Sequence, residues 1–311
     1  YSDHGSGMPR HKRLLHDSGM RVAMLVHIPE KWKHLRPTRP GASTDALVSF
    51  IDFAPTTLKL AQLPVPEYMQ GIPFLAVNKG APVREIVYGT RDRVDEVFEC
   101  SRSVRDRRWL YIRNYHPHLS WNQPSVFSDL GEIRDEITVF AANNVNALSV
   151  PQRHYAGPTK AAEELYDCRA DPENTRNLLV GAMTPEVEEN LQRLRKAYIG
   201  KRQEFGDCGA LPESEMRRMV ASEGKPMRDI IRGATAHKPD LETAWNAADK
   251  VGMASIDDLT RQLRSGDVSG RYWAIIGLRN ASFGDAGLHG KVVDFLDDVA
   301  PAVRIETAGW L

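Results

Sequence analysis

The chain has 311 residues, enough for two domains, and 41% of them are apolar, close to the norm for globular proteins. Its 41 basic and 41 acidic residues give no net charge, which argues against a nucleic-acid binder held by phosphate attraction. No stretch is apolar for the length of a transmembrane helix, and the three cysteines are too widely spaced for a zinc ribbon or a disulfide framework.

Both ends of the sequence look like cuts. It begins at Tyr1, directly before a polar Asp3-His4-Gly5, and it stops at Leu311 inside an apolar helical pattern without a stop signal. We therefore expect a fragment of a longer protein. In that case the absence of a signal peptide says nothing about export.

Residues 1–83 have the pattern of an α/β unit. The run Met20–Ile28 is mostly apolar, which is typical of a buried strand. An amphipathic helix is expected within Asp45–Leu63, with Pro55 in its first turn. Asp52 would then lie at the helix N-terminus, where a carboxylate is favoured.

Residues 84–213 are predicted to form a small antiparallel β subdomain that ends in a helix. Asp106-Arg107 suits the turn of a hairpin, and Pro117–Pro158 has the irregular composition of a long surface excursion. The helix is expected at Pro185–Glu204, from its helix-start proline and its apolar spacing. The expected strands are Ile86–Thr90, Val97–Val104, Trp109–Asn114 and a short fourth strand at Leu165–Asp167.

Residues 214–311 contain an internal repeat. Three residues recur 33 positions later: Leu263, Arg271 and Leu278 as Leu296, Arg304 and Leu311. Paired helices stacked as a short solenoid give this kind of pattern. We therefore expect a HEAT-like helical tail that makes protein contacts and can be separated from catalysis.

A pattern that suits a cation site opens the chain. Ser2-Asp3-His4-Gly5 places a carboxylate beside an imidazole, two groups that bind divalent cations, and the glycine lets the backbone turn away. On its own, the pattern is more typical of a structural turn.

The residues that follow make the pattern specific. Lys12 comes eight residues after His4, and His16-Asp17-Ser18-Gly19-Met20-Arg21-Val22 leads into the apolar run. This order resembles the type I sulfatases, in which Ser-Asp-(Asn/His)-Gly is followed by Lys and then by Tyr-Glu-Gly-Gly-x-Arg-Val-Pro. The matching residues are Lys12, Gly19, Arg21 and Val22, and the departures are His16, Asp17, Ser18 and Ala23.

Two later segments keep the order of the same family. Asp52-Phe-Ala-Pro-Thr-Thr-Leu58 resembles its Asp-x-x-Pro-Thr-x-Leu helix. Glu164-Leu-Tyr-Asp167, Asp171-Pro172 and Asn177-Leu178 resemble its closing segment. The resemblance covers residues 1–205, and with the helical tail it points to a bacterial, planctomycete-like branch. It implies the C-terminal portion of an α/β, alkaline-phosphatase-like sulfatase fold.

The resemblance also implies a role for each residue of the first motif. Asp3 is expected to bind calcium, and His4 either binds the same ion or hydrogen-bonds the sulfate or the nucleophile. Lys12 is expected to contact the sulfate or the bridging oxygen and to neutralise charge on the leaving group. The alternative for Lys12 is a solvated surface lysine.

A polar cluster follows the first strand of the β subdomain. Arginine pairs bidentately with anions and carboxylates accept sugar hydroxyls, so this cluster suits a sulfated sugar. A solvated charged loop explains the same residues equally well. The expected substrate-binding residues are Arg91, Arg93, Asp95 and Glu96.

The family's nucleophile is a Cys or Ser in (Cys/Ser)-x-(Pro/Ala)-x-Arg that is oxidised to formylglycine, and it is expected in a missing N-terminal segment. None of Cys100, Cys168 and Cys208 fits this pattern. Ser149-Val-Pro-Gln-Arg153 matches formally, but it follows the cation motif instead of preceding it, and we interpret it as a chance match. The 311 residues alone are therefore expected to be inactive.

The favoured prediction is calcium-assisted hydrolysis of sulfate esters on a sulfated carbohydrate, at a periplasmic or extracellular location that the resemblance implies. A phosphoester or phosphonate-ester hydrolase of the alkaline phosphatase superfamily is the first alternative, since metal-binding Asp-His-Gly motifs occur there too. A non-catalytic helical-repeat interaction protein is the second, and the extent of the repeat separates it from an enzyme.

Overall fold

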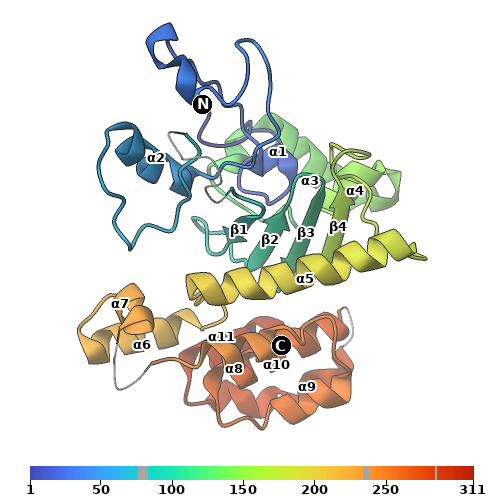
Figure 1. Ribbon diagram of the computed structural model, residues 1–311. Coiled ribbons are helices and arrows are strands. Elements are labelled where there is room, and N and C mark those ends of the chain that lie inside the picture. The colour runs from blue at the N-terminus through green and yellow to red at the C-terminus, as the bar shows by residue number, and fades with distance from the viewer. Residues whose placement is uncertain (76–82, 234–237, 284–285) are drawn as a thin grey trace.

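A four-stranded antiparallel sheet organises the structure, a computed structural model that describes residues 1–75, 83–233, 238–283 and 286–311. The strands lie in the order β1-β2-β3-β4 (Figure 1). All four predicted strands are confirmed, although their ends differ by a few residues. They are β1 Val87–Arg91, β2 Ser101–Arg105, β3 Trp109–Asn114 and β4 Glu163–Asp167.

Strand β3 is buried on both of its faces. Trp109 and Tyr111 pack into one core, and Leu110 and Ile112 pack into a second core on the other side. This alternation follows the two-residue period of a strand. Burial on both faces explains why the segment reads as a nearly continuous apolar run.

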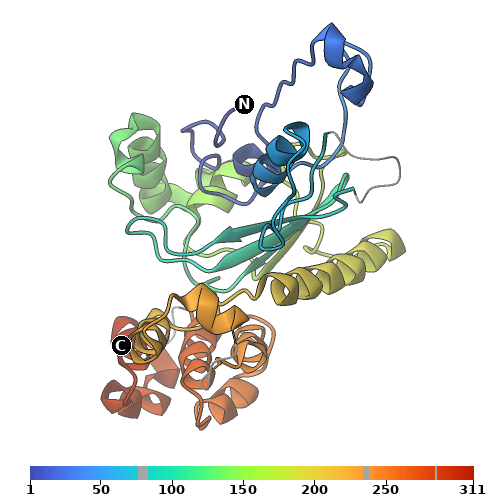
Figure 2. The ribbon, with the colours of Figure 1, turned by 60° about the vertical axis from the view of Figure 1, so that its left-hand side comes forward.

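The two faces of the sheet carry different layers (Figures 1 and 2). Helix α5 (Pro185–Phe205) lies along one face and buries an apolar stripe that includes Leu194. The other face is covered by the N-terminal segment through Leu14 and by helix α4 (Val150–Ala156) through Tyr155. The segment with the first functional motif is thus packed against the sheet.

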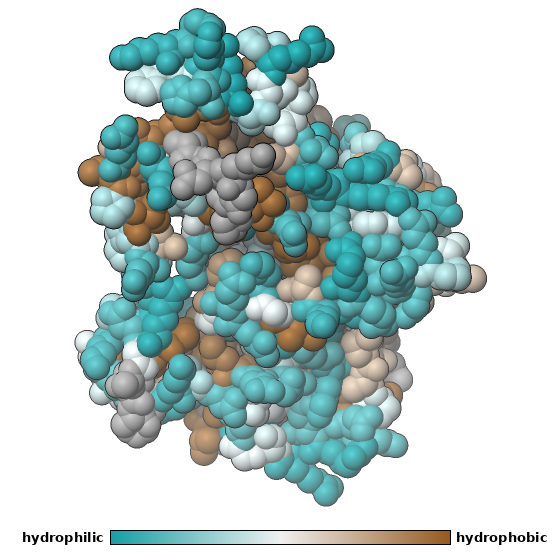
Figure 3. Space-filling model, in the orientation of Figure 1, coloured by the Kyte–Doolittle hydropathy of each residue, from teal (hydrophilic) through white to brown (hydrophobic). Residues whose placement is uncertain are grey.

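The prediction of a buried strand at Met20–Ile28 is wrong. No strand of the described residues lies beside this segment, so its backbone forms no ladder, and Leu25 is 87% exposed. Exposed apolar residues, including Phe50 and Leu63, also flank helix α2 (Phe53–Leu60) in the sequence, and Figure 3 shows hydrophobic surface in the region of this helix. Every strand pair in the described residues is antiparallel, so the parallel sheet of an α/β fold is not seen in them.

The predicted irregular excursion at Pro117–Pro158 is also wrong, since it contains two helices. Helix α3 (Glu132–Asn144) follows the short η3 (Ser128–Leu130), and α4 follows η4 (Val145–Ala147). Much of the apolar surface of α3 is exposed, with Phe140 at 47%. The weak apolar pattern and the prolines and glycines around it hid these helices from sequence reasoning.

Helix α2 (Phe53–Leu60) confirms the helix expected within Asp45–Leu63, in shorter form. Asp52 lies at its N-terminus, as predicted, and is buried. Its carboxylate accepts a hydrogen bond from the Ile72 N–H at 2.7 Å and pairs with Arg84. These contacts tie the helix to the chain that leads into β1.

The chain after residue 213 is helical, as predicted, while the division into domains at residues 83 and 213 stays a prediction. The helices of this part are α6 Glu213–Glu223, α7 Met227–Arg232, α8 Leu241–Ala248, α9 Ile256–Gln262, α10 Val268–Ala281, η5 Ala286–Lys291, η6 Val293–Asp297 and α11 Pro301–Trp310. The remaining short helices are α1 Asp17–Met20, η1 Glu30–Leu35 and η2 Phe50–Asp52. Within the described ranges, no helix combines the length and apolar character needed to cross a membrane.

The helical tail packs into the same core as the sheet, which opposes the expectation that it is separable. Trp245 on α8 lies near Tyr115, with ring centroids 5.2 Å apart, and its Nε1–H donates to the Asp207 carbonyl at 2.7 Å. Asp249 accepts hydrogen bonds from the Tyr115 hydroxyl at 2.7 Å and from Arg202 at 3.0 Å. These contacts make the tail and the sheet one packed unit.

Replacing Trp245 by alanine should therefore destabilise the sheet as well as the tail. Truncating a buried tryptophan costs about 3–5 kcal/mol. We expect one urea unfolding transition, followed by far-UV circular dichroism, that moves to lower urea in Trp245→Ala. The matched control is Trp32→Ala, since Trp32 is 44% exposed and should matter little. Two separate unfolding transitions in the unmodified chain would contradict the packing of tail and sheet as one unit.

Candidate functional site

The first motif lies in a loop, residues 2–23, whose two ends run side by side. We call these residues the motif loop. The Ser2 N–H donates to the Ala23 carbonyl at 3.2 Å, and the Gly5 N–H donates to the Gly19 carbonyl at 3.3 Å. A Cβ on Gly5 would lie 2.2 Å from a carbonyl oxygen of the facing segment. The close approach of the two ends therefore requires glycine at this position.

Asp3 and His4 are arranged as two neighbouring cation ligands. The Nδ1–H of His4 donates to the Gly5 carbonyl, which leaves the free lone pair on Nε2. That Nε2 lies 3.7 Å from an Asp3 carboxylate oxygen, and the two side chains are 40% and 83% exposed. The Asp3 carboxylate oxygen and Nε2 of His4 can both bind a divalent cation, but calcium takes about 6–8 ligands. The pair therefore supplies two candidate ligand atoms, fewer than a calcium ion takes.

Lys12 lies over the ring of Phe127, with its ammonium 4.3 Å from the ring centroid. The next residue, Arg13, has a left-handed backbone with φ 75°. Its guanidinium donates to the Ser125 hydroxyl at 2.7 Å and pairs with Asp95, contacts that hold this unfavourable conformation. Backbone strain held by surrounding contacts is concentrated at functional sites.

Two of the predicted substrate-binding residues contact residues next to Lys12 or to its aromatic partner Phe127. Asp95 pairs with Arg13, and Glu96 accepts a hydrogen bond from the N–H of Val126, next to Phe127. The motif loop, the loop after β1 and the segment before α3 therefore meet at one surface. We call this surface the Lys12 cluster, made of Lys12, Arg13, Asp95, Glu96 and Phe127.

The other two predicted substrate-binding residues lie elsewhere. Arg93 forms an ion pair with Glu213 at 3.2 Å. Arg91 is 5% exposed, its guanidinium lies 5.2 Å from the ring centroid of Trp121, and its Nε and Nη1 have no hydrogen-bond partner among the described residues. Burial lowers the pKa of Arg91. The structure thus brings Asp95 and Glu96 to the Lys12 cluster but leaves both arginines outside it.

Among the described residues, no hydrogen bond, ion pair or ring contact joins Lys12 to Asp3 or His4. Both lie on the motif loop, and the backbone N–H of Lys12 donates to the Ser6 carbonyl at 3.1 Å. The candidate cation ligands and the candidate sulfate-binding lysine are therefore two groups on one loop.

A buried hydrogen-bond network fixes the motif loop on the sheet. The Glu164 carboxylate on β4 accepts hydrogen bonds from Nε2 of His16 at 3.0 Å, from Nε2 of His154 at 3.1 Å and from the Tyr166 hydroxyl at 2.5 Å. Its second oxygen accepts from the Asn114 amide at 2.7 Å. Burial alone would raise the pKa of Glu164, but the hydrogen bonds from both histidines hold it well below the usual value. We call these five residues the Glu164 network.

Three side chains of this network resemble a metal centre, because ligand atoms of His16, His154 and Glu164 all lie within 4.8 Å of one another. A metal bound at Nε2 would leave the proton of His154 on Nδ1. That Nδ1 lies 3.3 Å from the Nε–H of Arg10, which is itself a donor. Two donors would then face each other, so His154 keeps its proton on Nε2 and donates it to Glu164. The arrangement is a hydrogen-bond network.

The formal nucleophile match at Ser149 is a helix cap. The N–H and hydroxyl of Ser149 both contact Oε1 of Gln152, at 2.9 and 2.8 Å, at the start of α4. Proline in the first turn completes a common helix-start pattern. Burial raises the pKa of the Cys100 thiol, the opposite of what a nucleophilic cysteine needs.

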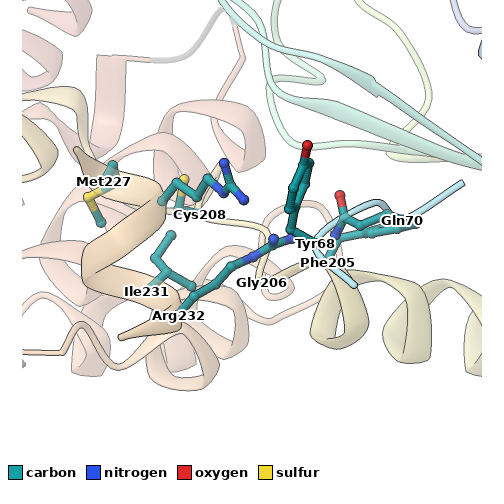
Figure 4. Close-up of a pocket in the computed structure, with 9 residues that line it drawn as sticks. Tyr68, Gln70, Phe205, Gly206, Cys208, Met227, Ile231 and Arg232 are labelled. Atoms are coloured by element: carbon teal, nitrogen blue, oxygen red, sulfur yellow. The ribbon is translucent and has the colours of Figure 1, made fainter. Parts of the chain in front are cut away.

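A cavity of about 480 Å³ lies apart from both groups of predicted residues, between the segment around Tyr68 and helix α7 (Figure 4). Phe205 and Arg232 also line it, and the Arg228 guanidinium lies 5.8 Å from the Tyr68 ring centroid. None of the predicted site residues lines this cavity.

Sequence reasoning missed Arg13 and Phe127 and gave Glu164 no role. No sequence pattern marks Phe127 as a site residue, because it belongs to an irregular segment. Arg13 directly follows Lys12, and that position alone could have raised it as a candidate. Glu164 precedes the apolar Leu165 and Tyr166 in a strand, and a carboxylate in an apolar strand is a sign of a buried polar partner.

The Glu164 network predicts a loss of stability in acid. Burial lowers the pKa of His16 from 6.5 to about 4, and the hydrogen bond to Glu164 offsets part of this shift. Because the folded-state pKa is depressed, the neutral imidazole contributes stability above pH 6.5 that is lost as the pH falls toward 4. The shift corresponds to about 3 kcal/mol. Burial also lowers the pKa of His116 and of His118, so part of the acid sensitivity has other sources.

The test is the urea midpoint as a function of pH. His16→Gln should flatten its fall between pH 6.5 and 4, while His27→Gln, a change at an exposed histidine, should leave it unaltered. An identical pH dependence in His16→Gln and the unmodified chain would refute the assignment.

Comparison with known proteins finds similarity to sulfatases over part of the chain. Residues 8–148 match the family model described as N-sulphoglucosamine sulphohydrolase, C-terminal. An ulvan-active sulfatase of Formosa agariphila is 36% identical over 216 residues, which are 70% of this chain and 34% of that protein. Human N-sulphoglucosamine sulphohydrolase is 26% identical over 243 residues, which are 74% of this chain and 46% of that protein. The chain spans less than half the length of these relatives.

Solved structures with some similarity include a 2-O GAG sulfatase, at 20% identity and a TM-score of 0.32, covering 50% of this chain and 25% of that one. Another is a complex with D-glucosamine-2-N,6-O-disulfate as substrate, at 18% identity and a TM-score of 0.31, covering 50% of this chain and 24% of that one. TM-scores this low do not establish a shared fold. This chain is therefore similar to the C-terminal region of N-sulphoglucosamine sulphohydrolase over residues 8–148, and to two sulfatases over most of its own length.

Proposed function

We propose that the protein containing this chain hydrolyses sulfate esters of a sulfated carbohydrate, with calcium and with a formylglycine nucleophile supplied by residues outside these 311. One observation carries the proposal. The segment that follows Lys12 and the closing segment of the sulfatase-like pattern meet, across 148 positions, in the buried hydrogen bond between His16 and Glu164. This contact between the motif loop and the closing segment supports the proposal that they belong to one site.

Further contacts hold the motif loop in place. Asp17 forms two hydrogen bonds with the Arg105 guanidinium on β2, at 2.9 and 3.0 Å. The N–H of Asp17 donates to the Asn174 side chain at 2.8 Å. Catalysis by fixed charges requires groups that do not reorganise during the reaction. A loop docked at several points on a sheet meets that requirement.

The proposed roles follow from the chemistry of each group. Asp3 and Nε2 of His4 would hold part of the coordination shell of calcium, which supplies positive charge against the sulfate when it is bound. Lys12 would contact a sulfate oxygen. Its ammonium lies over an aromatic ring, and no carboxylate of the described residues pairs with it. It is therefore free to bind an anion.

The substrate class rests on the relatives and on the Lys12 cluster. The two curated relatives are named for ulvan and for N-sulphoglucosamine, both sulfated carbohydrates or their units. Asp95 is 53% exposed although it pairs with Arg13, and Glu96 is also exposed. Carboxylates beside a lysine can accept sugar hydroxyls while the lysine binds the sulfate.

The calcium role of Asp3 is tested in a protein that joins this chain to the formylglycine-bearing region. Asp3→Asn removes one anionic ligand, so it should lower both the calcium content, measured by elemental analysis, and the turnover of a sulfated substrate. Asp45→Asn is the matched control, because Asp45 is exposed and outside the motif loop. Unchanged calcium content in Asp3→Asn would remove Asp3 from the ligand set.

The role of Lys12 is tested in the same protein. Lys12→Ala should reduce kcat by about 10²–10³, the usual loss for one preorganised electrostatic contact, with an unchanged melting temperature. Lys12→Arg should retain part of the activity because the charge remains. Lys33→Ala, at a lysine 69% exposed, is the control and should be as active as the unmodified enzyme. Full turnover of a folded Lys12→Ala variant would mean that Lys12 is surface charge.

A further inference from the structure

Arg13 and Asp95 pair with each other, and both have a backbone conformation that is uncommon outside glycine. Arg13 has φ 75° and Asp95 has φ 53°, in the left-handed region. Asp95 lies in a two-residue turn, across which Val94 and Val97 exchange backbone hydrogen bonds at 3.1 and 3.0 Å. This turn fixes the direction of the carboxylate that binds the Arg13 guanidinium.

The Arg13 guanidinium also ties down the segment that leads to α3. Its Nη1–H donates to the hydroxyl of Ser125 at 2.7 Å, and Ser125 is buried. Glu96, the second residue of the turn, accepts a hydrogen bond from the N–H of Val126. The backbone that precedes Phe127 is therefore held both by the motif loop and by the turn after β1.

Phe127 connects Arg13 to Lys12. The guanidinium carbon of Arg13 lies 5.3 Å from the centroid of the Phe127 ring, and the Lys12 ammonium lies 4.3 Å from it. Phe127 is 54% exposed, so packing in a core does not fix its ring. Within the part of the chain that the structure describes, the Lys12 ammonium forms no hydrogen bond or ion pair, and its contact is this ring. The place of the ammonium therefore follows the place of the ring.

We propose that Arg13 is a positioning residue: by holding Phe127 against the motif loop, its guanidinium sets where the Lys12 ammonium lies. Both terminal nitrogens of Arg13 are bonded, to Ser125 and to Asp95, and its side chain is 15% exposed. Little of it is left to bind a substrate directly. The effect of this placement on turnover rests on the proposed function, whereas the placement of Lys12 itself does not.

The left-handed backbone of Arg13 offers a competing explanation, because it turns the chain between Lys12 and the buried Leu14. Glycine adopts φ 75° without strain and carries no side chain. Arg13→Gly therefore keeps the turn and removes the guanidinium, which separates the two explanations without straining the fold. Asp95→Asn is a milder variant, since asparagine tolerates the left-handed region while the negative charge is lost.

The test in the full chain is the NMR signal of the Lys12 side chain, recorded with isotope-labelled lysine. A methylene group over the face of an aromatic ring is shifted upfield by the ring current. The Lys12 signal is identified by its absence in Lys12→Ala and by the loss of its upfield shift in Phe127→Leu. The signals of the other lysines report whether each variant is folded.

Arg13→Gly should remove most of the upfield shift, and Asp95→Asn should remove part of it. Arg39→Ala, a change at an exposed arginine outside the motif loop, should retain the full shift. A full upfield shift in folded Arg13→Gly would overturn the proposal, because the backbone turn alone would then place Lys12. If Arg13→Gly does not fold, a full shift in Asp95→Asn would overturn the proposal in the same way.

The second measurement uses the protein that joins this chain to the formylglycine-bearing region. Arg13→Gly should lower kcat by about 10–100-fold, as expected when a catalytic group is misplaced. In a Lys12→Ala background the same change should cost little more, because Arg13 acts through Lys12. An equal further loss in that background would overturn the proposal. A lost upfield shift with unchanged turnover would support the positioning of Lys12 and would instead refute the role of Lys12 in the proposed hydrolysis.

Discussion

The buried carboxylate of Glu164 is the constraint on which the arrangement of this protein depends. A charge without solvent is costly unless donors surround it, and removing one donor leaves part of that charge uncompensated. The donors come from different parts of the chain: His16 from the motif loop, Asn114 from β3, His154 from α4 and Tyr166 from β4 itself. The motif loop therefore cannot leave the sheet without exposing or stranding the carboxylate, and Lys12 is held by a network that it does not touch.

On the opposite face of the sheet, a buried positive charge is also compensated by surrounding groups. Arg102, on β2, is buried and pairs with Asp207 and Asp92, and its guanidinium lies 5.3 Å from the ring centroid of Trp245 in the tail. Asp92 and Asp207 thus neutralise Arg102, and Trp245 of the helical tail covers it, on the face of the sheet opposite the motif loop. We infer that the tail stabilises the sheet by packing.

Much of the fold could be predicted from the sequence because period and turn chemistry are local. Local patterns were enough to predict the strand at Trp109–Asn114, the turn at Asp106 and the helix start at Pro185. The strand predicted at Met20–Ile28 does not form, because a strand needs a neighbouring strand. No strand of the described residues lies beside this segment. The prediction of the candidate site likewise succeeded for some residues and failed for others. Asp95 and Glu96 follow one strand and reach the Lys12 cluster together, whereas Arg91 and Arg93, from the same segment, are directed away by Trp121 and Glu213. Such partners lie far along the chain and leave no local signal.

The central claim is that this chain serves sulfate-ester hydrolysis, and the direct measurement is the ratio of kcat/KM for an aryl sulfate and the matching aryl phosphate. It is measured in a protein that joins this chain to its formylglycine-bearing region, with calcium, zinc or manganese added in turn. The account predicts a preference for the sulfate that requires calcium and falls with Lys12→Ala. A preference for the phosphate supported by zinc or manganese would contradict it and place the chain among the phosphoester hydrolases.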